Sequence, residues 1–209
     1  MIDFDKIVHD PVSRRAFLAR MSAAGLGVAA TALLAPAAEA SGKPILEIVN
    51  VPDNANFPGI PGRNPTERVL NYALTLETLE ADLYRQALNV AAGKPVETPL
   101  ADDVSGYTMA VPTGNVLTTL APIGFLYLQQ FAAVEAAHRD FLRAAITQMG
   151  GTPVGPNPNG YKADFGNDLG SILTVIRTVE ETGVRAYLGA AQFIDDFKVT
   201  QTAASIYST

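Results

Sequence analysis

Apolar residues recur at alternating intervals of three and four positions in three segments of the chain, residues 65–92, 120–149 and 168–193. This spacing puts the apolar side chains on one face of an α-helix. The pattern therefore predicts three long helices that pack side by side. A fourth helix is expected from Lys198, and the sequence ends at Thr209 after little more than two turns of it.

Local signals mark where the first helix begins and where two of the helices end. Asn64 precedes Pro65 and Glu67, which predicts a helix start with Asn as the cap and Pro in the first position. Gly93 and Gly150, each followed by a proline, predict the ends of the first and second helices. These local signals agree with the boundaries that the apolar pattern indicates.

Two irregular segments separate the helices. Residues 94–117 are rich in Pro and Gly, and within them residues 106–111 could form a short strand or pack over the bundle end. Residues 152–167 contain three prolines and have the length of a crossover between two parallel helices. The sequence thus predicts an all-α fold with a long crossover between helices 2 and 3.

Each apolar stripe carries a glutamate where a core residue is expected: Glu77 in the first, Glu135 in the second and Glu180 in the third. His138 follows Glu135 by one turn. Buried carboxylates are costly unless they are compensated, and a bound cation compensates them effectively. The first hypothesis is therefore a carboxylate and imidazole metal site inside a helical bundle.

Other interpretations of the same positions stay open. Glu77 and Glu80 lie one turn apart, so one of them could face solvent or pair with Arg68 or Arg85. Glu135 and His138 could form a surface hydrogen bond, and Glu180 could pair with Arg177 or Arg185. The third helix repeats the first, since Tyr84 and Tyr187 each follow a stripe glutamate by seven residues. Both tyrosines are interpreted as core aromatics whose hydroxyls bond a carboxylate. We predict that Tyr84, Tyr187 and Glu80 lie around the ligands and contact them.

The first forty residues have the pattern of a twin-arginine export signal. Arg14 and Arg15 precede Phe17 and Leu18, an Ala- and Gly-rich apolar run follows, and Ala38-Glu39-Ala40 is a cleavage site of small residues. This predicts a signal over 1–40, an extended lead-in over 41–64, a helical domain over 65–209 and a periplasmic location. The apolar run could also stay uncleaved and anchor the protein to the inner membrane.

Composition narrows the chemistry. The chain has no cysteine, which excludes disulfides, thiol nucleophiles and thiolate-bound zinc or iron–sulfur clusters. His9 lies in the leader, so His138 is the one histidine outside it. A formal net charge of −6 without a basic patch gives no indication of a nucleic-acid partner.

Residues 70–84 and 180–191, together with the Glu135-x-x-His138 spacing, resemble the ferritin-like superfamily of four-helix bundles. They are most similar to exported bacterial ferritin-like domain proteins related to the desiccation-related proteins of plants. The resemblance implies an up-down four-helix bundle that binds iron or manganese, with Glu77, Glu135, His138 and Glu180 as ligands and Glu135 as the bridge. It also implies a second Glu-x-x-His on the fourth helix, after residues 203–207. The printed sequence ends where this motif is expected to begin, so either the given chain is shortened or the protein retains half of the usual dinuclear site. The metal could accordingly be a di-iron centre, a single ion or absent.

Three functions follow from these features. The first is an exported ferritin-like protein that binds iron or manganese and carries out an oxidation there. The second is a metal-free protein of the same fold with a stress or desiccation role. The third is an accessory subunit, held at the membrane by its leader, that packs on a larger complex. Each of the three hypotheses leaves open whether the protein forms a homo-oligomer.

If the leader is a twin-arginine signal, replacing Arg14 and Arg15 with Lys should abolish recovery of the protein in the periplasm, because that pathway recognises the arginine pair. Cell fractionation with N-terminal sequencing of the exported protein measures this, and the mature chain should begin near Ser41. Unchanged periplasmic recovery would exclude the twin-arginine interpretation. An exported chain that still begins at Met1 would favour the anchored subunit.

Overall fold

The computed structural model of the chain describes residues 57, 59–190 and 193. Three long helices make up this part: α5 (Pro65–Ala91), α6 (Ala121–Gln148) and α7 (Leu169–Ala190). A 3-10 helix, η3 (Val104–Gly106), interrupts the first connection, and no strand occurs among the described residues. The predicted all-helical bundle is confirmed, and each helix begins and ends within three residues of its predicted bounds.

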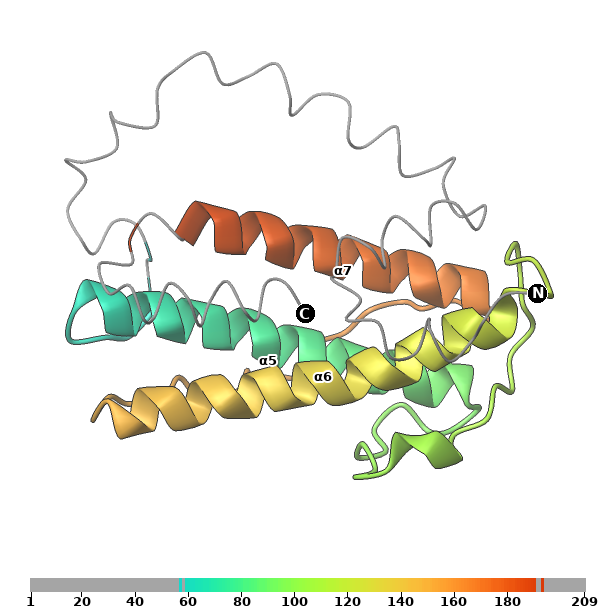
Figure 1. The fold of residues 1–209 in the computed structure, drawn as a ribbon, viewed down its shortest axis with the longest axis horizontal. Helices are drawn as coiled ribbons and strands as arrows, with labels where there is room; N and C mark the ends of the chain where they lie inside the picture. The colour runs from blue at the N-terminus through green and yellow to red at the C-terminus, as the bar shows by residue number, and fades with distance from the viewer. Residues whose placement is uncertain (1–56, 58, 191–192, 194–209) are drawn as a thin grey trace, which may run out of the picture.

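The directions of the helices follow from the long crossover. Figure 1 shows α5 running opposite to α6, while α7 runs in the same direction as α6 after the chain has returned along the bundle. The return is made by residues 149–168, which join α6 to α7. The predicted fourth helix, the leader over 1–40 and most of the lead-in over 41–64 lie outside the described residues.

The start of α5 is built as its sequence predicts. Asn64 has an extended backbone and its Oδ1 accepts a hydrogen bond of 2.8 Å from the backbone N–H of Glu67. Glu67 is itself buried and accepts from the backbone N–H of Thr152 at 3.1 Å. At the other end, Gly93 takes a φ of 65°, a conformation that costs glycine little and other residues more. The cap thus positions α5 and fastens the start of the crossover to it.

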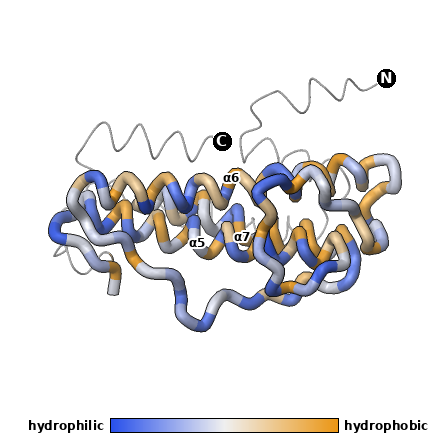
Figure 2. Tube along the Cα trace, turned by 90° about the horizontal axis from the view of Figure 1, so that it is seen from below, coloured by the Kyte–Doolittle hydropathy of each residue, from blue (hydrophilic) through white to orange (hydrophobic). Residues whose placement is uncertain are grey.

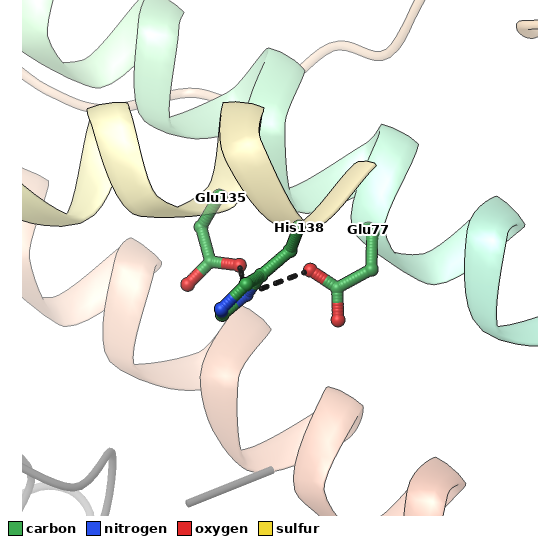
Figure 3. Close-up of side chains that lie close together, drawn as sticks. All are labelled: Glu77, Glu135 and His138. Carbon is green, nitrogen blue, oxygen red and sulfur yellow. Dashed lines mark hydrogen bonds and ion pairs between the residues drawn. The ribbon is translucent and has the colours of Figure 1, made fainter. Parts of the chain in front are cut away.

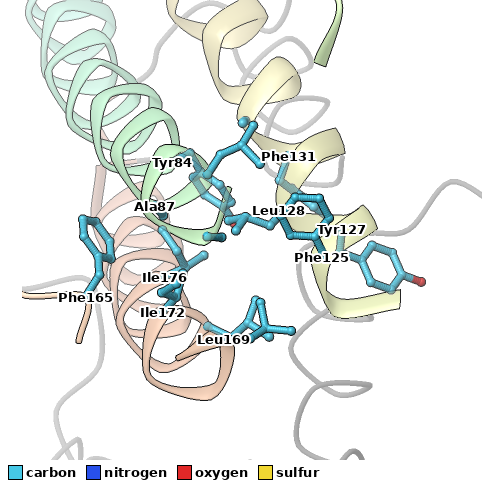
Figure 4. Packing of buried hydrophobic residues seen from close by; sticks show 14 of the residues in the cluster. Tyr84, Ala87, Phe125, Tyr127, Leu128, Phe131, Phe165, Leu169, Ile172 and Ile176 are labelled. Atoms are coloured by element: carbon cyan, nitrogen blue, oxygen red, sulfur yellow. The ribbon is translucent and has the colours of Figure 1, made fainter. Parts of the chain in front are cut away.

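The main apolar core lies between the C-terminal half of α5, the N-terminal half of α6 and the N-terminal half of α7 (Figure 4). Tyr84 stacks on Phe131 with ring centroids 6.2 Å apart. Leu128, Ile172 and Ile176 are completely buried around them. Apolar and polar residues are interspersed along the helices, as Figure 2 shows. Because the apolar residues recur with the period of the helix, they share one face, which packs in the core. Met149, predicted on the second stripe, is 48% exposed because it caps the C-terminal end of α6, beyond the last helical residue.

Buried polar side chains of α5 hold the crossover in place. The amide of Asn71 donates to the carbonyl oxygen of Thr152 at 3.1 Å and accepts from the backbone N–H of Val154 at 2.7 Å. Four turns further along α5, Gln86 Nε2 donates to the carbonyl oxygen of Tyr161 at 2.8 Å. The crossover therefore runs beside α5 in the direction of that helix, which brings the chain back to the end where α6 began.

The segment before α6 is fastened by the same means. Arg85 and Asn89 both donate to the carbonyl oxygens of Val96 and Thr98. Gln129 of α6 donates to the carbonyl oxygens of Val104 and Tyr107, at 2.8 and 3.0 Å. Residues 106–111 accordingly pack over the bundle end and do not form the strand that the sequence also allowed.

We expect Asn71→Ala to lower the free energy of unfolding by about 3 kcal/mol, because it leaves buried backbone groups of the crossover without a hydrogen-bond partner. Urea unfolding followed by circular dichroism measures the change. Asn157→Ala is the matched control, since Asn157 is exposed and its amide bonds only within its own turn, donating to Gly160 and accepting from the backbone N–H of Asn159. Equal destabilisation by the two substitutions would contradict the proposed function of Asn71 as the crossover anchor.

Candidate metal centre

Glu77, Glu135 and His138 meet in the interior of the bundle. Glu77 projects from α5, and Glu135 and His138 project from adjacent turns of α6, so that both carboxylates face the imidazole (Figure 3). Nδ1 of His138 lies 3.1 Å from Oε2 of Glu135 and 3.3 Å from Oε2 of Glu77. One potential ligand atom from each residue lies within 4.8 Å of the other two. The structure thus brings together three of the four residues that the sequence predicted as ligands.

Apolar clusters close the site at both ends. Towards the C-terminal end of α5 lies the main core, with Tyr84 and Phe131. Towards its N-terminal end lies a second cluster, which includes Leu74 and Leu142. Both carboxylates are completely buried, and the His138 side chain is 12% exposed. Charges in such a position interact strongly, because little water is present to screen them.

A tyrosine from α7 orients one of the carboxylates. The hydroxyl of Tyr187 donates to Oε1 of Glu77 at 2.5 Å, within the short range typical of hydrogen bonds to a charged oxygen. The other oxygen of Glu77 is the one that faces His138. Tyr187 thus bonds a carboxylate of a different helix, and the ring of Tyr84 packs against Phe131 in the apolar core.

Glu180 and Glu80 are also buried, each at most 1% exposed. Among the described residues, neither joins the group of three whose ligand atoms lie within 4.8 Å of one another. A ligand function for Glu180 therefore stays a prediction.

The sequence left open whether Glu77 or Glu80 faces solvent, and the structure buries both. The carboxylate of Glu80 lies against Gly183 of α7, where a Cβ would collide with Oε1 of Glu80. The glycine on the opposite helix is the signal that could have indicated this burial.

Two arginines that the sequence offered as partners of the stripe glutamates, Arg85 and Arg177, pair with other carboxylates. Arg85 pairs with Asp82 at 2.6 Å and Arg177 with Glu181 at 2.9 Å. These partners lie beside the stripe glutamates and not on the stripe. The inward position of Glu77, Glu80 and Glu180 is therefore compatible with ordinary ion pairs on the flanks of the same helices.

The two carboxylates change the protonation of His138. Burial of the imidazole acts to lower its pKa, but the hydrogen bonds to Glu135 and Glu77 and the charges of both outweigh this and raise the pKa of His138 from 6.5 to about 9. In metal-free protein, an imidazolium ion thus partly balances the two buried carboxylates. A divalent cation could replace that proton, since two carboxylate oxygens and an imidazole nitrogen already face one point.

Comparison with known proteins agrees with this arrangement. A family model described as a ferritin-like domain matches residues 66–209, which is more than half of the chain. The search of curated proteins found no match. None of the described helices is both long and apolar enough to span a membrane.

The raised pKa of His138 predicts a pH dependence of stability in metal-free protein. Because the folded pKa exceeds the unfolded value, the ion pairs contribute their full stability below pH 6.5, and this contribution is lost as the pH rises to about 9 and above. The free energy of unfolding should fall by up to about 3 kcal/mol over that range. Urea titrations of chelator-treated protein between pH 6.5 and pH 9.5 measure it.

The imidazole can also be followed directly. The chain contains two histidines, so the Cε1–H resonance of His138 can be assigned in a His9→Ala variant by NMR. Its midpoint should lie near pH 9 and should fall in Glu135→Gln, which removes the charge that contributes most to the shift. A midpoint near 6.5 in the parent protein would show that the carboxylates do not hold this proton.

Proposed function

The chain belongs to the ferritin-like domain family, and on that premise we propose that it is an exported protein that binds iron or manganese inside its helical bundle. Glu77, Glu135 and His138 would hold the metal. An oxidase or stress-protective activity at that metal is part of the proposal. The substrate class is left open.

The observation that carries the proposal is the convergence of two carboxylates and an imidazole on one buried point. Oxygen ligands with one nitrogen suit iron and manganese, and the described part of the chain has no thiolate that would favour a softer ion. When bound, such a metal supplies a centre that can change oxidation state or polarise a bound oxygen ligand. The protein supplies the positions of the ligands and keeps most water away from them.

The residues around the ligands support this function. Tyr187 holds Glu77 so that Oε2 faces the site, which is the contact expected of a residue that orients a ligand. The apolar clusters around Tyr84 and Leu142 exclude solvent on both sides. Glu80 of α5 and Glu180 of α7 place two further carboxyl groups in the same interior, where a cation would compensate any charge that they carry.

The twin-arginine pattern at Arg14 and Arg15 supports export of the folded protein to the periplasm. That pathway carries proteins already folded, commonly with a cofactor inserted beforehand, so a leader of this type is consistent with a metal-binding bundle. Whether the leader is removed or anchors the protein to the inner membrane decides between a periplasmic protein and a membrane-associated one.

One observation favours a second candidate, a metal-free ferritin-like protein that is a structural or accessory subunit of a membrane-associated complex. His138 already bonds Glu135 and Glu77, and Tyr187 bonds Glu77. A network of this kind can be stable as a polar core without any ion. The two candidates differ in whether the purified protein binds metal.

If the site binds metal, Glu135→Gln should weaken Fe(II) and Mn(II) binding at least tenfold, because one carboxylate ligand is lost while the size of the side chain is kept. Anaerobic calorimetric titration of chelator-treated protein measures the affinity, and elemental analysis measures the metal in protein purified from cells. Circular dichroism should show unchanged helical content.

Glu181→Gln is the matched control, since Glu181 is the chain neighbour of Glu180 but is partly exposed and pairs with Arg177. It should bind metal as the parent does. Equal metal content in the parent and Glu135→Gln would remove Glu135 from the site. No binding by the parent protein would favour the metal-free subunit.

A further inference from the structure

Helices α5 and α7 meet at two successive levels beside the metal centre. At the first level, the hydroxyl of Tyr187 donates to Oε1 of Glu77 at 2.5 Å. At the second level, the carboxylate of Glu80 lies against the backbone of Gly183. The two helices run in opposite directions (Figure 1), and residues three or four positions apart share a face of a helix. The two contacts are therefore neighbouring parts of one α5–α7 interface.

The close approach at the second level depends on the missing side chain of Gly183. A Cβ added there would lie 3.2 Å from Cδ and 3.6 Å from Oε2 of Glu80, and it would overlap Oε1. Glu80 is 1% exposed, so its carboxylate cannot turn away without displacing other buried atoms. A Cβ added to Gly189, in the same helix, would have no packing neighbour within 4 Å. The interface is thus tightly packed at Gly183, whereas Gly189 faces open space.

This close packing determines where the hydroxyl of Tyr187 lies. The tyrosine ring is rigid and only two side-chain torsions join it to α7, so its hydroxyl follows the helix backbone when α7 moves. Gly183 and Tyr187 are about one turn apart, so a displacement of α7 at one is passed to the other. An O–H···O hydrogen bond requires oxygen atoms about 2.5–3.0 Å apart, so a shift of about 1 Å is enough to break the bond to Glu77.

We propose that Gly183 is a positioning residue of the metal centre, which acts through Tyr187 on Glu77. By keeping α7 close to α5, it lets Tyr187 hold Oε1 of Glu77, and Oε2 of the same carboxylate then faces His138 at 3.3 Å. A larger residue at position 183 would push the two helices apart and release Glu77. The effect on the helix interface is independent of any metal, whereas the effect on metal affinity rests on the proposed function.

Carbon-13 NMR of the metal-free, tyrosine-labelled full chain tests the interface, because the Cζ resonance of a tyrosine shifts when its hydroxyl donates to a carboxylate. The resonance of Tyr187 is the one that disappears in Tyr187→Phe. Gly183→Ala should move this resonance to the position of a tyrosine without a carboxylate partner, whereas Gly189→Ala, the matched control, should leave it in place. Circular dichroism should show the helical content of the parent in each variant. An unmoved resonance in Gly183→Ala, or an equal shift in both glycine variants, would overturn the proposal.

A compensating substitution separates positioning from a general loss of packing. Glu80→Asp shortens the side chain by one methylene and withdraws the carboxylate from position 183. Adding it to Gly183→Ala should therefore return the Tyr187 resonance to its position in the parent protein. A double variant that is folded but keeps the displaced resonance would refute the assignment.

Metal affinity gives a second measurement. By anaerobic calorimetric titration, Gly183→Ala and Tyr187→Phe should each weaken Fe(II) and Mn(II) binding about tenfold, as the loss of a residue that orients a ligand does. The two substitutions together should bind no more weakly than Tyr187→Phe alone, because they act through one hydrogen bond. Fully additive losses would contradict this route. No binding by the parent protein would reject the proposed function of the chain, and the NMR result would still decide the function of Gly183.

Discussion

The burial of Glu77 and Glu135 is the constraint on which the rest of this bundle depends. An uncompensated carboxylate in an apolar interior costs several kcal/mol, and here two of them share the space between two apolar clusters. His138 and Tyr187 provide the hydrogen-bond donors that reduce this cost. Positive charge, whether a proton on the imidazole or a metal cation, is what makes such an interior stable. The burial of the two carboxylates, which would destabilise the fold without compensation, thus also forms the candidate metal site.

Helix α5 contacts most of the other segments, because one face packs against the other helices and its flank bonds the crossover. Its apolar face, with Glu77 within it, packs against α6 and α7. Its flank carries buried polar residues, among them Asn71 and Gln86, that bond the backbone of the crossover. An irregular segment has no internal partners for its own N–H and C=O groups, so these side chains replace the bonds that a regular element would make. The crossover that they hold lets α6 and α7 run in the same direction.

The period of the α-helix also separates two environments on the α5–α6 pair, the buried metal centre and an outer pocket. Glu135 and His138 point into the bundle, while Ala136 and Arg139, the residues that follow them, line the outer pocket. A carboxylate and imidazole cluster in an enclosed space suits a cation. The metal centre and the outer pocket share no lining residue.

Much of the architecture can be predicted from the sequence, because it depends on local signals. The apolar periodicity gives the three helices, and Asn64 and Gly93 mark the start and end of α5, because caps and positive φ angles depend on neighbouring residues alone. Periodicity also placed Glu77, Glu135 and His138 on inward faces. What it could not decide is which groups meet across helices, because that depends on register between segments more than fifty residues apart. Only the tertiary structure pairs Tyr187 with Glu77, buries Glu80 against Gly183, and places Glu180 in the interior but outside the group of three. The raised pKa of His138 belongs to the same class, since it arises from two carboxylates on different helices at distances that no single segment determines.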